Sequence, residues 1–148
     1  MLAELLHPER VNIALEATDK EAAVRALAAL LVRPESEANE ESVHDVLMER
    51  ERLASTGVGS GVAIPHGRFD GVVELRAAVA VCADGVDFDA VDGLPVKILV
   101  AIVGPRSMPQ KHLAALAGVS RVLRNSAVRD ALIAADDNAE AYHLLVES

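Results

Sequence analysis

The chain has 148 residues, of which 51% are hydrophobic and 25% charged. This length and composition are typical of a globular domain with an apolar core. The 14 Lys and Arg residues against 23 Asp and Glu give a net charge of −9, and the aromatic residues number only two Phe and one Tyr. A negative field and so few stacking rings argue against nucleic-acid binding.

The sequence shows neither a membrane-spanning pattern nor a secretion pattern. No apolar run reaches the roughly 20 residues that a membrane-spanning helix needs, and the start of the chain shows no signal-peptide pattern. The single cysteine, Cys82, cannot form an internal disulfide. We therefore expect a cytoplasmic protein without direct membrane insertion.

The N-terminal part predicts a strand followed by a helix. Apolar residues alternate with others over 11–15, a pattern typical of a short strand. Thr18 and Glu21 have the spacing of a capping box, which predicts the start of a helix continuing over 22–31. We expect Arg33-Pro34 to end this helix, because proline disfavours a helical residue before it.

A second helix is expected after a polar loop over 35–39. Asn39 is a suitable N-cap. The last turn carries Arg50 and Arg52, where positive charges suit the helix dipole. The segment over 55–61 that follows has glycine at every second position from 57, which is too many glycines for a helix and too regular for a plain linker.

The second half predicts strands and then helices. Residues 75–83 form a candidate strand, and 97–103 are almost continuously apolar, as in a central strand covered on both faces. Ser107 and Gln110 have capping-box spacing before an apolar helix, and the tail over 126–147 predicts two short helices.

Strands that alternate with amphipathic helices predict an α/β/α sandwich with a mixed sheet flanked by helices. No internal repeat and no Gly/Ser-rich or Pro-rich tract divides the sequence. We therefore expect a single domain over residues 1–148.

The candidate site centres on His66, which lies between Pro65 and Gly67. Glycines let backbone N–H groups approach an anion closely, so four of them form a candidate phosphate-binding loop: Gly57, Gly59, Gly61 and Gly67. Imidazole, with a pKa near ~6.5, is mostly neutral at physiological pH and offers one nucleophilic nitrogen to a phosphoryl group. The alternative is a turn whose histidine only bonds a backbone carbonyl.

Two further residues are candidates. His112 follows the start of a helix, where the dipole and free N–H groups attract anions. Arg50 carries a planar cation with five donors that suits phosphoryl oxygens. Each has a simpler alternative, a solvent-facing helix residue for His112 and a surface cation at a helix end for Arg50.

Other motifs do not fit. The glycine spacing is not that of a dinucleotide-binding loop, and no Walker A sequence occurs. The five histidines have no local metal-ligand spacing, so we expect neither metal nor cofactor, although His66 and His112 could meet in space with an acid.

Three segments, in order, resemble the signatures of a known family; they cover residues 50–68, 86–96 and 111–113. The family is that of the EIIA type-2 domains, the fructose/mannitol-type phosphocarriers of the bacterial phosphoenolpyruvate:sugar phosphotransferase system. The likeness extends from about Leu5 to the C-terminus. It is nearest to the nitrogen-regulatory branch in residues 5–11, 17–21 and 54–61.

The resemblance implies a role for each candidate. His66 would accept a phosphoryl group on Nε2 from a phosphohistidine of an HPr-type carrier. His112 would donate a hydrogen bond to the phosphoryl group or orient the ring, and Arg50 would neutralise charge. The protein would then be a phosphotransferase-system component that carries phosphate stoichiometrically as phosphohistidine.

The resemblance also implies partners and leaves alternatives. A regulatory EIIA would signal to a target such as a transporter or kinase. A sugar-specific EIIA would instead pass the phosphoryl group to an EIIB domain. An unphosphorylated interaction module of the same fold is a third alternative, and a zinc hydrolase is a fourth.

Overall fold

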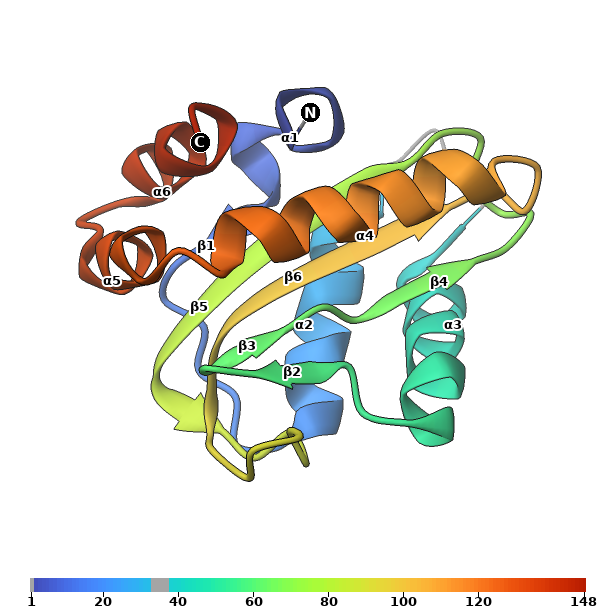
Figure 1. Cartoon of the computed structure of the whole chain (residues 1–148). Coiled ribbons are helices and arrows are strands. Elements are labelled where there is room, and N and C mark those ends of the chain that lie inside the picture. Colours follow the sequence, from blue (N-terminus) through green and yellow to red (C-terminus); the bar gives the residue numbers. More distant parts are fainter. Residues whose placement is uncertain (1, 33–37) are drawn as a thin grey trace.

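The computed structural model describes residues 2–32 and 38–148, and one mixed sheet forms its centre (Figure 1). The strands lie in the order β1-β5-β6-β3-β2, and β4 also pairs with β6. The central pair β5–β6 is antiparallel, whereas β1 is parallel to β5, and β3 and β4 are parallel to β6. The strands are β1 (Val11–Asn12), β2 (Gly57–Gly59), β3 (Val62–Ala63), β4 (His66–Arg68), β5 (Arg76–Val86) and β6 (Val96–Gly104).

Helices cover both faces of this sheet. Two of them pack on one face, α2 (Lys20–Leu31) and α3 (Glu40–Leu53). The other face is covered by α1 (Leu2–Leu5), α4 (Pro109–Leu123), α5 (Ser126–Ala134) and α6 (Asn138–Val146). A 3₁₀ turn, η1 (Pro8–Arg10), precedes β1. The α/β sandwich expected from the sequence is confirmed.

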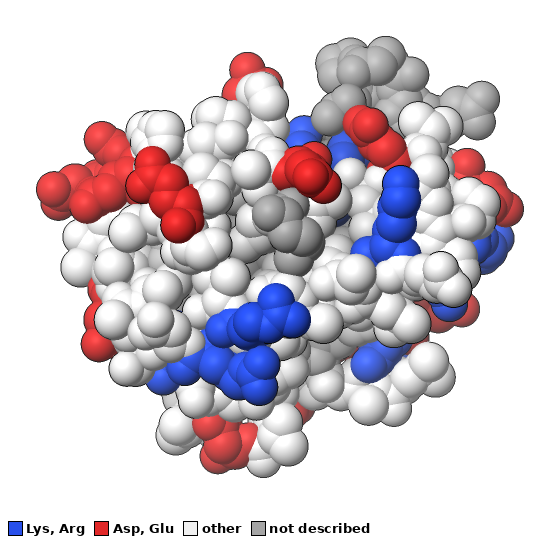
Figure 2. All heavy atoms as spheres, turned by 45° about the horizontal axis from the view of Figure 1, so that its top comes forward, with Lys and Arg blue, Asp and Glu red and all other residues white. Residues whose placement is uncertain are grey.

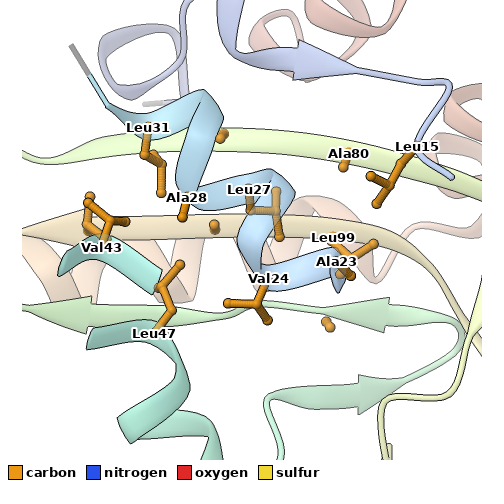
Figure 3. Close-up of a cluster of buried hydrophobic side chains, with 14 of the residues drawn as sticks. Leu15, Ala23, Val24, Leu27, Ala28, Leu31, Val43, Leu47, Ala80 and Leu99 are labelled. Carbon is orange, nitrogen blue, oxygen red and sulfur yellow. The ribbon is translucent and has the colours of Figure 1, made fainter. Parts of the chain in front are cut away.

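The position of β6 between two buried faces explains why its sequence is almost continuously apolar. Successive side chains point to opposite faces of a sheet, and here both faces are buried. Leu99 (Figure 3), Ala101 and Val103 enter the core under α2 and α3. Ile98, Val100 and Ile102 enter the core under α4. The strand expected over 97–103 therefore lies at the centre of the molecule.

Two helix starts differ from the expected caps. Helix α2 is capped by Asp19 and not by Thr18, since the Asp19 carboxylate accepts a bond from the N–H of Ala22 at 2.8 Å. Carboxylates are strong N-caps. Helix α4 has no side-chain cap, so the expected capping box of Ser107 and Gln110 is wrong. The helix begins instead at a proline, which suits the first turn because its missing N–H has no partner to lose there.

The remaining local predictions have mixed outcomes. Asn39 caps α3 in a reciprocal box with Ser42, and the tail forms two short helices, α5 and α6. The strand expected over 11–15 is regular only in β1. The expected helix end at Arg33-Pro34, and the loop as far as residue 37, lie outside the described residues. None of the described helices is long and apolar enough to cross a bilayer.

Candidate functional site

A cavity of about 690 Å³ lies where α3, β4 and the start of α4 meet. Strand β4 runs parallel to β6 with His66 opposite Ile102, near the carboxyl end of β6. The chain leaves β6 at that same end and enters α4, whose first turn holds His112. The cavity thus brings together three predicted residues from separate segments, His66, His112 and Arg50, and it is also lined by Gly67.

The His66 ring is held by its own neighbouring backbone. Its Nδ1 lies 2.7 Å from the carbonyl oxygen of Ile64. A carbonyl oxygen only accepts hydrogen bonds, so Nδ1 carries the proton and Nε2 keeps its lone pair. The pKa of His66 is lowered, first by burial and then by the positive charge of Arg50, against the Ile64 bond and the Glu51 charge, which raise it. The ring is therefore a neutral nucleophile at physiological pH. The sequence left open that His66 only bonds a backbone carbonyl; that bond is present, and it sets the tautomer of the ring.

His112 lies beside this ring. The two ring centroids are 5.7 Å apart and the planes are inclined at 53°. The side chain is buried, and its Nδ1 has no hydrogen-bond partner among the described residues. Burial, followed by the nearby charges of His66 and Arg68, lowers the pKa of His112 to about 4. At neutral pH the ring is uncharged and has one N–H to donate.

Arginines supply the positive charge of the cavity. Arg50 is half-buried at the end of α3, and one of its Nη atoms donates to the carbonyl oxygen of Ala54 at 2.8 Å. That bond fixes the guanidinium and leaves other donors for an anion. Arg68 and Arg106 also line the cavity, and Glu49 is the only acid among the lining residues that the structure describes.

Sequence reasoning missed Arg68 and Arg106. Arg68 had a visible signal, because it is two residues after His66 in a motif already singled out, and alternate residues of a strand share a side. Arg106 lies in the β6–α4 loop and is paired with Asp70 at 3.2 Å. Only the fold brings that loop to the cavity, so the sequence alone offered no signal for it.

A buried carboxylate holds the segment that leads from α3 to the site. Glu51 accepts bonds from the N–H of Thr56 at 2.9 Å and from its hydroxyl at 2.6 Å. Lys20 of α2 lies 3.0 Å from the other carboxylate oxygen. The only hint in the sequence is an acid in the last turn of a helix, where the dipole favours cations. Glu51 thereby fixes the end of α3 next to Arg50.

The predicted glycine loop is divided between two places. Gly67 lines the His66 cavity, whereas Gly57, Gly59 and Gly61 do not. These three belong to the β2–β3 hairpin, in which Gly59, Ser60 and Gly61 have φ of 98°, 58° and 76°. The left-handed turn is the structural reason for glycine on both sides of Ser60.

Within the described ranges, one cluster of possible metal ligands lies away from this cavity, on α3. Ligand atoms of Glu41, His44 and Asp45 are within 4.8 Å of one another. The i, i+3 and i+4 spacing was the sequence signal for this cluster. A guanidinium already occupies its surroundings, since Arg25 lies 2.9 Å from the Glu41 carboxylate and 3.4 Å from Nδ1 of His44. The cluster therefore has a protein cation as its counter-charge.

Comparisons with known proteins identify the family of the chain. The family described as "Phosphoenolpyruvate-dependent sugar phosphotransferase system, EIIA 2" matches residues 4–148. A nitrogen regulatory protein of Bradyrhizobium diazoefficiens is 34% identical, covering 97% of this chain and 94% of its own length. A fructose-specific EIIA component of Haloferax volcanii is 35% identical, with coverage of 94% and 90%. The crystal structure of the nitrogen regulatory protein IIA-Ntr from Neisseria meningitidis superposes with a TM-score of 0.91 at 31% identity, covering 97% of this chain and 98% of that one.

Proposed function

The chain belongs to the EIIA type-2 family of the phosphoenolpyruvate-dependent sugar phosphotransferase system, and from this premise we propose that it carries a phosphoryl group on Nε2 of His66. The donor is a phosphohistidine on an HPr-type carrier protein. The observation that carries the proposal is the 2.7 Å bond between Nδ1 of His66 and the Ile64 carbonyl, which leaves Nε2 as the nucleophile. The cavity around that atom is lined by cations, as a phosphoryl group requires.

The transfer is an in-line exchange between two imidazoles. The Nε2 lone pair of His66 forms a new N–P bond while the N–P bond of the donor breaks. The donor ring, protonated on its other nitrogen, recovers the electron pair and leaves as a neutral imidazole. The Nδ1 proton of His66 stays on its ring, bonded to Ile64. No proton has to leave the site, so the protein contributes position and charge.

The surrounding residues divide this work. Arg50, held by Ala54, and Arg68 offset the charge of the phosphoryl oxygens. His112, uncharged because its pKa is about 4, donates one hydrogen bond without adding a competing charge. Gly67 lets β4 pack against Val46 of α3, where a Cβ would overlap the valine side chain.

We further propose that the phosphoryl group acts as a regulatory signal. Phosphorylation adds roughly −1.5 to −2 charges at neutral pH, and a transporter or kinase partner would respond to that change. The nitrogen regulatory relatives support this role. The fructose-specific relative favours a second candidate, transfer onward to an EIIB domain. Labelled phosphate on this chain distinguishes the two candidates. Label that reaches a sugar supports transfer to an EIIB domain, and label that does not reach a sugar supports the regulatory role.

The central test is a mass measurement. Incubation with phosphoenolpyruvate, the first enzyme of the system and an HPr-type carrier should add the mass of one phosphoryl group in an acid-labile bond. His66→Ala should abolish the adduct. His143→Ala, a matched change at an exposed histidine on α6, should leave it intact. An adduct that survives in His66→Ala would refute the proposal, and no adduct with any carrier would favour the interaction module.

A further inference from the structure

A second cavity, of about 450 Å³, lies at the far end of α4. Its walls are the β2–β3 hairpin, the last turns of α4 and the start of α5; the lining residues are Val58, Gly59, Ser60, Val62, Ile64, Ala117, Ser120, Arg121, Leu123, Arg124 and Arg129. No residue in the described part of the chain lines both this cavity and the His66 cavity. Arg121 is nine residues beyond His112, which is about 14 Å along a helix axis. The two cavities are therefore separate sites.

Among the residues that the structure describes, three arginines and no acid line this second cavity, although the chain has a net charge of −9. Arg129 is committed to the backbone, because its Nη1 donates to the carbonyls of Leu123 and Arg124 at 2.9 Å each. Arg121 and Arg124 are exposed, and neither has an ion pair or side-chain hydrogen bond with any described residue. Figure 2 shows basic side chains gathered in a group in the lower left of the view, on the side toward which α4 runs in Figure 1.

The helix dipole explains only part of this clustering of arginines. A cation in the last turn of α4 is favourable, but three guanidinium groups around one cavity also repel one another. Such a cluster is stabilised when an anion lies between its members, and the planar guanidinium fork matches phosphate oxygens best.

The remaining walls suit the organic part of a ligand. Val62, Ile64 and Leu123 are buried apolar residues that border the cavity, and Ser60 and Ser120 add hydroxyl groups. The hairpin that carries Ser60 is fixed, since the Ser60 N–H donates to the Asp92 carboxylate at 2.9 Å. This bond is the first cause that lowers the pKa of Asp92, so that acid is committed to the turn.

We propose that this cavity binds a small organic phosphate. Arg121 and Arg124 contact the phosphoryl oxygens, with Arg129 holding the junction of α4 and α5 beside them, and the apolar wall contacts the organic group. A volume of a few hundred Å³ is the usual size for a small-molecule site. The site is independent of phosphate transfer to His66.

The test is a titration followed by amide NMR with two dianionic probes, inorganic phosphate and phenyl phosphate. Both probes should shift the amide signals of residues 58–60 and 117–124 with saturation. Phenyl phosphate should bind more tightly, because only it reaches the apolar wall. Arg121→Gln and Arg124→Gln should each weaken binding by about tenfold or more, as expected for one lost charge-assisted hydrogen bond.

Arg52→Gln is the matched control, since it removes one exposed arginine from α3 and lines neither cavity. Its affinity for both probes should equal that of the parent chain. The proposal is overturned if the signals of 58–60 and 117–124 do not move, or if only signals near His66 move. It is equally overturned if Arg52→Gln weakens binding as much as the other two substitutions.

Discussion

His66 and His112 are held in different ways. The His66 ring is anchored by the bond from Nδ1 to Ile64, whereas His112 is buried with an Nδ1 that has no partner among the described residues. A buried polar atom without a partner is costly, so the unpaired Nδ1 of His112 reduces the stability of the fold. In the proposed transfer, His66 is the nucleophile and His112 donates a hydrogen bond to the phosphoryl group.

His112→Ala should therefore slow phosphorylation of His66 without abolishing it. The loss of one charge-stabilising donor typically reduces a rate about 10²–10³-fold. Quenched-flow transfer from a phosphorylated HPr-type carrier measures the rate, with His143→Ala as the control. An unchanged rate in His112→Ala would return this residue to the role of a plain helix residue.

The pKa of His112 also links stability to pH. The pKa is about 4 in the folded chain and 6.5 when unperturbed, so the unfolded chain binds more protons between these values. The free energy of unfolding should therefore fall as the pH is lowered from 6.5 toward 4. Urea unfolding across this range should show a shallower fall for His112→Asn than for the parent chain. Parallel pH profiles would contradict the lowered pKa.

Strand β4 packs closely against α3 at Gly67. A Cβ on Gly67 would overlap Cγ1 of Val46, and β4 also carries His66. Gly67→Ala should destabilise the fold by about 1–3 kcal/mol, as overpacking does, and should slow phosphorylation because His66 is displaced. Combining Gly67→Ala with Val46→Ala makes room for the new methyl group. The double variant should regain part of the lost stability and part of the lost phosphorylation rate. The crowding explanation fails if the double variant is as impaired as Gly67→Ala.

Elements with a strong pattern of their own were predictable from sequence. The apolar run of β6 and the Asn39 cap of α3 are local signals, and both are present in the structure. The strands β3 and β4 have two and three residues and gain their regularity by pairing with β6. No periodicity shows in so few residues, so only the tertiary pairing defines them.

The candidate site was also predictable only where the signal is local in sequence. His66, His112 and Arg50 were singled out from the neighbouring residues and the family motifs, and they line one cavity. The sequence does not reveal the Glu51–Lys20 pair, because these two residues are 31 positions apart and meet only when α2 packs beside α3. Contacts of this kind depend on packing between helices, which residue types do not encode locally.

At the scale of the whole molecule, the central strands join the two cores. Neighbouring residues of β5 alternate between them, with Ala78 and Ala80 under α2 and α3 and Ala77 and Val79 under α4. Neither helical layer has a sheet of its own to pack on. A loss of packing on one face is therefore transmitted through the same strands to the other face, and the two faces should unfold as one unit.

Leu27→Ala tests this coupling. Leu27 is fully buried in the core under α2 and α3, and its truncation should cost about 2–5 kcal/mol. Tyr142, the only tyrosine, packs against the opposite core, so its fluorescence reports on the far face. The urea midpoints from Tyr142 fluorescence and from circular dichroism should fall together. Val73→Ala, at a residue 86% exposed, should leave both midpoints in place. If the Tyr142 midpoint stays fixed while the dichroism midpoint falls, the two faces unfold independently and the sheet does not couple them.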